Sequence, residues 1–137
     1  PTPMLLSTMM HEVAHQLGFA REDEANYIAY LTCSLHPDAD FQYAGAIFAL
    51  NYTMNAVYGQ DREAYGELYA RLDEGVKRDL AENSKYHDKY DGPVRRVSSR
   101  TNDAYLKANN QKDGERSYGR MVDLLLAQYR YEKENPR

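Results

Sequence analysis

Helix-breaking residues divide this chain into segments that suit helices and leave little room for a sheet. The breaks lie at Pro3, Gly18, Pro37, Gly59 and the pair Gly92-Pro93. Proline suits the first turn of a helix, and glycine suits the position just past its end. Between the breaks, apolar residues recur three and four positions apart, and the alternating pattern of strands is absent. The sequence therefore predicts an all-α fold.

We expect about six helices in a single compact domain that covers residues 1–137. The predicted helices are residues 4–17, 21–34, 38–58, 61–90, 101–110 and 117–132, with an extended loop over residues 94–99. Asp38 or Asp40 should cap the third helix, and Asp61 should cap the fourth. A chain of 137 residues is long enough to bury a hydrophobic core without disulfides or a structural metal.

The charge of the chain argues against nucleic acid as a partner. The formal net charge is −4 at pH 7, and acidic and basic residues are mixed, so no basic stripe could neutralise a phosphate backbone. The single cysteine, Cys33, excludes an internal disulfide. No apolar run approaches the roughly 20 residues of a membrane-spanning helix, so we expect this piece to be a soluble domain.

The segment His11-Glu12-Val13-Ala14-His15 is an HExxH motif inside the first predicted helix. Residues four apart share a helix face, so both imidazoles can reach one metal ion. Glu12 lies about 100° further round the helix and can face a water molecule at the open coordination position. The motif predicts a zinc-peptidase site with His11 and His15 as ligands and Glu12 as general base.

Catalytic zinc normally takes a third protein ligand, and the start of the second predicted helix supplies acidic candidates. Glu22 is preferred, because Asn26 lies four residues later on the same face and could orient a histidine. Glu24 lies about 200° from Glu22 on a helix, so the two can hardly serve one ion together. Glu24 is the alternative ligand, and Asp23 ranks third.

The spacing of HExxH and Glu-x-x-Ala-Asn resembles the gluzincin group of zinc peptidases, in which a glutamate is the third ligand and an Asp or Asn follows four residues later. The resemblance implies Glu22 as the ligand and Asn26 as the residue that orients a histidine. Only six residues separate His15 from Glu22, fewer than in most gluzincins, so a tight turn at residues 18–20 must reverse the chain. A metzincin pattern would place the third ligand at Arg21, which cannot bind zinc.

Two longer segments resemble an uncharacterised bacterial family, a domain of unknown function, of predicted membrane-anchored zinc metallopeptidases. They are HEVAHQLGFAREDEANYIAYL from residue 11 and NDAYLKANNQKDGERSYGRMVDLLL from residue 102. The resemblance covers nearly the whole chain and implies transmembrane helices ahead of this domain. A chain that starts at Pro1 and not at methionine agrees with that expectation. We therefore expect the fragment to be the C-terminal part of a longer, membrane-associated protein.

Together these patterns predict a zinc-dependent metallopeptidase that hydrolyses peptide bonds in a peptide or protein substrate. Tyr105 and Tyr118, in the second family-like segment, are candidates to donate a hydrogen bond to an oxyanion. Two alternatives stay open. One is a catalytically inactive zinc-binding or peptide-binding domain of a membrane-anchored regulatory protein, and the other is a helical bundle with a closed structural metal site.

Overall fold

The computed structural model describes residues 3–90 and 120–136, and within these residues it contains six α-helices and no strand. The helices are α1 (Leu5–Gln16), α2 (Glu22–Leu35), α3 (Ala39–Gln60), α4 (Arg62–Ala70), α5 (Glu74–Tyr90) and α7 (Met121–Glu134). None of these helices is both long and apolar enough to cross a bilayer. The prediction of an all-α fold is confirmed.

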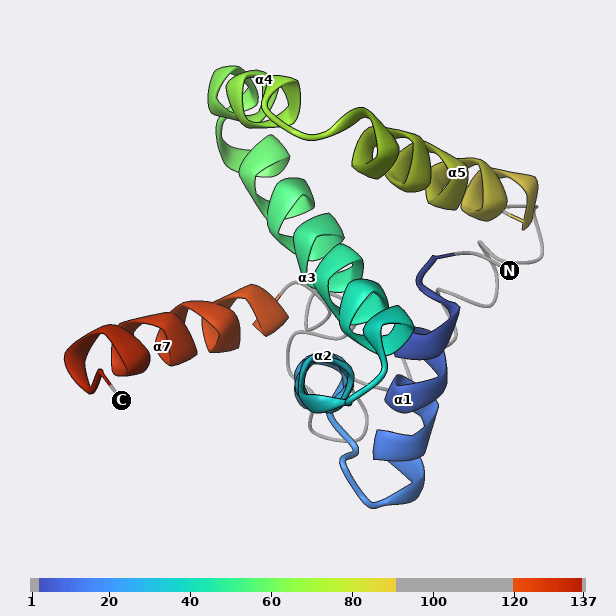
Figure 1. The fold of residues 1–137 in the computed structure, drawn as a ribbon, viewed down its shortest axis with the longest axis vertical. Helices are drawn as coiled ribbons and strands as arrows, with labels where there is room; N and C mark the ends of the chain where they lie inside the picture. Colours follow the sequence, from blue (N-terminus) through green and yellow to red (C-terminus); the bar gives the residue numbers. More distant parts are fainter. Residues whose placement is uncertain (1–2, 91–119, 137) are drawn as a thin grey trace, which may run out of the picture.

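Helices α1, α2 and α3 gather at one end of the molecule, and α3 runs from there to α4 at the other end (Figure 1). Helix α5 leads back from α4, and α7 packs on α2 and α3 (Figure 1). The three N-terminal helices begin and end within a few residues of the predicted bounds. The predicted helix over residues 101–110 and the loop over residues 94–99 lie outside the described residues.

The prediction of one continuous helix over residues 61–90 is wrong, because the chain breaks between α4 and α5 at residues 71–73. Asp73 Oδ1 accepts a hydrogen bond of 2.7 Å from the Gly75 N–H group, so this aspartate starts a new helix. Leu72 and Val76 keep the apolar spacing of four residues across the break. Periodicity alone therefore could not find it.

The other predicted caps are found, and they fix where α3 and α4 begin. The Asp38 side chain, and not that of Asp40, caps α3 by accepting the Asp40 N–H group at 2.8 Å. Asp61 caps α4 by accepting from the backbone of Glu63 and Ala64 at 3.0 and 2.9 Å. Each aspartate satisfies N–H groups that have no partner within the helix.

Small residues let the first three helices approach one another closely. Ala25, Ala29 and Cys33 recur every fourth residue on α2 and are all fully buried. Ser7 of α1 lies against Cys33, with its Oγ atom 3.7 Å from the sulfur. The larger core residues form a cluster with Ala29 and come from near the start of α1, from α3 and from α7; they are Met4, Ile47, Phe48 and Met121. These small residues therefore allow α1 to pack closely on α2.

Gly45 of α3 faces Cys33 so closely that a side chain at this position would collide with it. A Cβ atom on Gly45 would lie 2.8 Å from the Cys33 Cβ atom. Overpacking of this kind costs about 1–3 kcal/mol, and the helix propensity gained by alanine returns less than about 1 kcal/mol. We expect Gly45→Ala to lower the free energy of unfolding by about 1–2 kcal/mol in urea denaturation followed by circular dichroism.

A matched control is Gly66→Ala in α4, where nothing lies within 4 Å of the added carbon. Alanine should stabilise this exposed helical position by about 0.5–1 kcal/mol. Opposite signs for the two substitutions would support the close contact between α2 and α3. If both variants became more stable than the parent protein, the result would contradict the close approach of Gly45 to Cys33.

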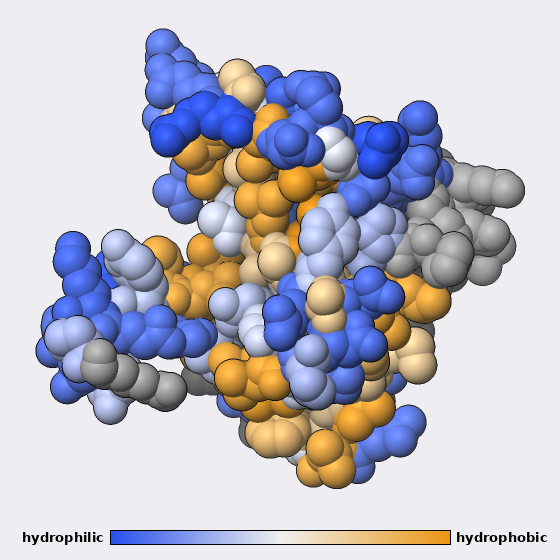
Figure 2. Space-filling view, in the orientation of Figure 1, coloured by the Kyte–Doolittle hydropathy of each residue, from blue (hydrophilic) through white to orange (hydrophobic). Residues whose placement is uncertain are grey.

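Helix α1 exposes apolar side chains on the side that faces away from α2. Leu5, Met9, Val13 and Leu17, at intervals of four residues, are 40–72% exposed. Figure 2 shows hydrophobic surface at the lower end of the molecule, around the turn that joins α1 to α2. Positions 11 and 15 fall on the opposite side of the helix, so this surface is separate from the HExxH histidines.

Candidate metal centre

The turn between α1 and α2 reverses the chain within five residues, and Gly18 makes this possible. Gly18 has a φ angle of +102°, a conformation that glycine adopts without strain. Its N–H group donates to the His15 carbonyl at 3.0 Å, and the Phe19 N–H group donates to the Ala14 carbonyl at 3.1 Å. This pair of bonds is a Schellman motif, as the sequence position of Gly18 predicts.

The same turn orients the ring of His15. The Nδ1 atom of His15 lies 2.7 Å from the carbonyl oxygen of Phe19. Because a carbonyl can only accept, Nδ1 carries the proton in this bond. With Nδ1 as the donor, Nε2 is the nitrogen that can bind a metal ion through its electron pair. Histidine ligands in metal sites are commonly fixed by such a bond from the second ring nitrogen.

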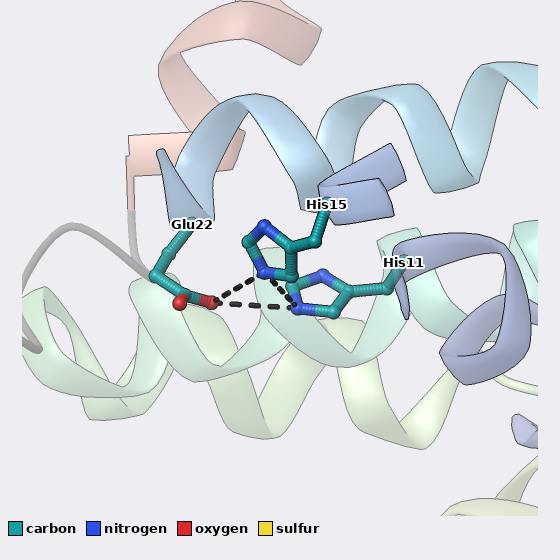
Figure 3. Close-up of side chains that lie close together, drawn as sticks. All are labelled: His11, His15 and Glu22. Atoms are coloured by element: carbon teal, nitrogen blue, oxygen red, sulfur yellow. Dashed lines mark hydrogen bonds and ion pairs between the residues drawn. The ribbon is translucent and has the colours of Figure 1, made fainter. Parts of the chain in front are cut away.

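His11, His15 and Glu22 bring three potential metal ligands to one place. The two histidine Nε2 atoms lie 3.0 Å apart, and Glu22 Oε2 lies 3.4 Å from that of His11 and 3.6 Å from that of His15. The three side chains point toward one another from α1 and from the first turn of α2 (Figure 3). These are the described residues that could hold a metal ion together.

The spacing of these three atoms fits a tetrahedral metal. Zinc binds histidine nitrogen and carboxylate oxygen at about 2.0–2.2 Å, which places neighbouring ligands of a tetrahedron about 3.3–3.6 Å apart. The observed separations of 3.4 and 3.6 Å fall in that range, and the separation of 3.0 Å between the two nitrogens is slightly shorter. Two nitrogens and one oxygen are also a donor set that suits zinc. The residues therefore fit the ion that the motif implies.

Glu22 is a buried carboxylate that remains ionised. Its burial would raise the pKa, but the hydrogen bond from His11 and the nearby His15 and His11 charges outweigh it, so the pKa lies below its usual value. The residue is 9% exposed. A largely buried anionic oxygen is therefore held against the histidines.

The other two acidic residues of the first turn have different surroundings. Glu24 is exposed and pairs with Arg21 at 3.6 Å. Asp23 is buried and accepts two bonds from the Arg21 guanidinium, at 3.1 and 2.9 Å. Neither belongs to the cluster that could hold a metal. Of the three acids named from the sequence, the fold brings only Glu22 beside the histidines.

The cluster lies in the wall of a cavity of about 470 Å³ that is bounded by four helices. Glu12, the predicted general base, lines the same cavity and is exposed. The remaining wall includes aromatic and amide side chains from α2, α3 and α5: Asn26, Phe48, Asn51, Tyr52 and Asn83. This volume lies within the range of about 300–1,000 Å³ typical of ligand pockets. One side of the cluster is thus open to a ligand.

Two buried polar atoms beside this cavity have no hydrogen-bond partner among the described residues. They are Nδ1 of His11 and Nδ2 of Asn26, and Asn26 is only 2% exposed. The predicted role of Asn26, to orient a histidine, stays a prediction. Buried polar groups are normally paired, so these two atoms are exceptions among the described residues.

The site contains residues that the sequence did not point out, and some predicted residues cannot be placed. Tyr105 and Tyr118 lie outside the described residues. The Phe19 carbonyl and the amides of Asn51 and Asn83 take part in the site without belonging to a motif. The short spacer between His15 and Glu22 was a signal for the tight turn that contains Phe19, and not for the bond that its carbonyl makes.

Comparison with known proteins identifies one family. The family described as Protein of unknown function (DUF3810) matches residues 1–126. Searches of curated proteins and of solved structures found no match.

Proposed function

The chain belongs to the family described as Protein of unknown function (DUF3810), and we propose that it is a zinc-dependent peptidase that hydrolyses peptide bonds. One observation carries the proposal. His11, His15 and Glu22 hold three ligand atoms at the spacing of a tetrahedral metal, on the wall of an open cavity that Glu12 also lines. Structural zinc sites use four protein ligands and leave no open position, whereas catalytic sites use three.

Three side chains would hold the ion, and a fourth would move protons. His11 and His15 would bind through Nε2, and Glu22 would bind through a carboxylate oxygen. A zinc ion bound in this way supplies Lewis acidity that makes water a stronger nucleophile at neutral pH and polarises a carbonyl. The bond from His15 Nδ1 to the Phe19 carbonyl would fix the orientation of the ring and leave Nε2 to bind the ion.

Glu12 is the residue that we propose as general base and general acid. Its carboxylate would take a proton from the attacking water as the new carbon–oxygen bond forms. The same group would then give that proton to the leaving amine as the carbon–nitrogen bond breaks. Its position in the cavity wall, one residue from His11, supports both steps.

A peptide or protein is the substrate that suits this cavity best. The walls combine apolar surface with amide side chains, and amides can both donate to carbonyls and accept from N–H groups of a peptide backbone. Anchoring of a longer parent protein in a membrane stays a prediction from the resemblance described above.

The direct test is removal and return of the metal. We expect protein purified without chelator to contain about one zinc per chain and to cleave a mixed peptide library. A strong zinc chelator should abolish cleavage, and added Zn²⁺ should restore it, whereas added Mg²⁺ should not, because histidine nitrogens are poor ligands for magnesium. Mass spectrometry of the peptides measures the result.

Two results would count against the proposal in different ways. Protein that binds no zinc, with zinc supplied during expression, would exclude the metal centre. Bound zinc with no cleavage of any peptide or unfolded protein would favour the inactive zinc-binding domain instead.

A further inference from the structure

A second cavity of about 330 Å³ adjoins the cavity of the metal cluster. Asn51 of α3 and Asn83 of α5 line both cavities, so the two cavities are neighbours at these residues. The second cavity lies between α3, α4 and α5, and Figure 1 shows α4 at the end of α3 that is remote from α1. A peptide that extends from the metal cluster past these two asparagines would reach the second cavity.

The lining of the second cavity combines aromatic and aliphatic side chains with the polar side chains of Asn51, Asn55, Asn83 and Ser84. Met54 comes from α3, Tyr65 and Tyr69 from α4, and Leu80 from α5. The two tyrosine rings stack with their centroids 5.7 Å apart. These rings, together with Met54 and Leu80, offer apolar contact to an aromatic or large aliphatic group.

The amides at the junction of the two cavities suit a peptide backbone. Asn83 is 6% exposed, although its side chain lines two cavities. A third amide, Asn26, faces the metal cavity with a buried Nδ2 atom that lacks a partner in the described part of the chain. An extended peptide carries carbonyl and N–H groups at every residue, so it can satisfy such amides as it passes.

We propose that the second cavity is a specificity pocket that takes an aromatic or large aliphatic side chain of the peptide substrate, while Asn51 and Asn83 hold the backbone next to it. The proposal rests on the proposed function, because it identifies the occupant from the continuity of this cavity with the metal site. A peptide side chain of this kind buries apolar surface against Tyr69 and Leu80.

The test fills the pocket without changing the metal site. Ala81 lines the second cavity only, and its position is exposed on α5, so phenylalanine there can enter the cavity with little effect on folding. Ala127→Phe on α7 is the matched control, because this exposed alanine lines neither cavity. Circular dichroism and zinc content should be the same for both variants and the parent.

Binding is measured by calorimetry on zinc-loaded Glu12→Gln protein, which needs no catalysis. The probes are blocked alanine hexapeptides with one central Phe, Leu, Ala or Asp. We expect the Phe peptide to bind about tenfold more tightly than the Ala peptide, and Ala81→Phe to remove this preference, because burial of one aromatic side chain contributes about that much. Ala127→Phe should keep the preference.

The outcomes separate this pocket from the peptidase proposal. Equal binding of the Phe and Ala peptides, or a preference that survives in Ala81→Phe, would overturn the pocket even if the wild-type protein cleaves peptides. A preference that Ala81→Phe removes, in a protein that never cleaves, would support the pocket and overturn catalysis. The same binding series without zinc shows whether the pocket depends on the metal.

Discussion

Replacement of Glu12 by glutamine is expected to lower kcat for peptide hydrolysis by about 10²–10⁴-fold, the usual contribution of general acid–base catalysis. Glutamine has nearly the same shape as glutamate but cannot take a proton from water or give one to the leaving amine. Glu12 lies outside the three-residue cluster, so the zinc content should not change. Steady-state kinetics with the best library peptide, together with metal analysis, measures both quantities.

Glu24→Gln is the control for this substitution. Glu24 also carries an exposed carboxylate, but it pairs with Arg21 and does not line the cavity. Its loss should leave kcat within about twofold, since exposed ion pairs contribute little. If Glu12→Gln kept full activity, or if Glu24→Gln lost as much, Glu12 would not be the general base.

Replacement of His11 by alanine is expected to weaken zinc binding by more than about a hundredfold. Loss of a residue that only hydrogen-bonds to a metal ligand already weakens metal binding by about 10–100-fold, and loss of a ligand should cost more. Only His15 and Glu22 would remain as ligands, and catalytic zinc sites normally use three. Peptide cleavage should disappear with the metal at low zinc concentration. Competition against a coloured zinc chelator measures the affinity.

His36→Ala is the matched control for the loss of an imidazole. His36 follows α2, where its ring stacks on Phe41, far from the cluster in the sequence and outside the cavity lining. This variant should bind zinc as the parent does. Equal zinc affinity of the His11→Ala variant and the parent protein would end the metal-centre proposal.

Much of the metal cluster could be predicted because its geometry is local. Two histidines four residues apart on a helix must share a face, and this needs no knowledge of the rest of the fold. The choice between Glu22 and Glu24 was harder, since it depends on how the turn at Gly18 sets the rotation of α2. Only the folded chain determines that rotation.

Other parts of the fold depend on contacts that a sequence pattern does not contain. The break between α4 and α5 is set by the Asp73 cap, and an aspartate inside a charged helical pattern gives a weak signal. Asn51 and Asn83 are 32 positions apart in the sequence and meet only because α5 folds back beside α3. No local rule predicts which of the chain's asparagines will share a cavity.

The bond between His15 and Phe19 has a consequence for how this chain tolerates change. Residue 19 supplies its main-chain carbonyl to the ring, and its side chain is exposed, so its chemical identity matters little to the histidine. Residue 18 supplies no atom to the ring, yet its left-handed backbone determines where that carbonyl lies. The path of the main chain therefore determines the alignment of a candidate ligand, and Gly18, which does not touch the His15 ring, is less replaceable than Phe19, which does.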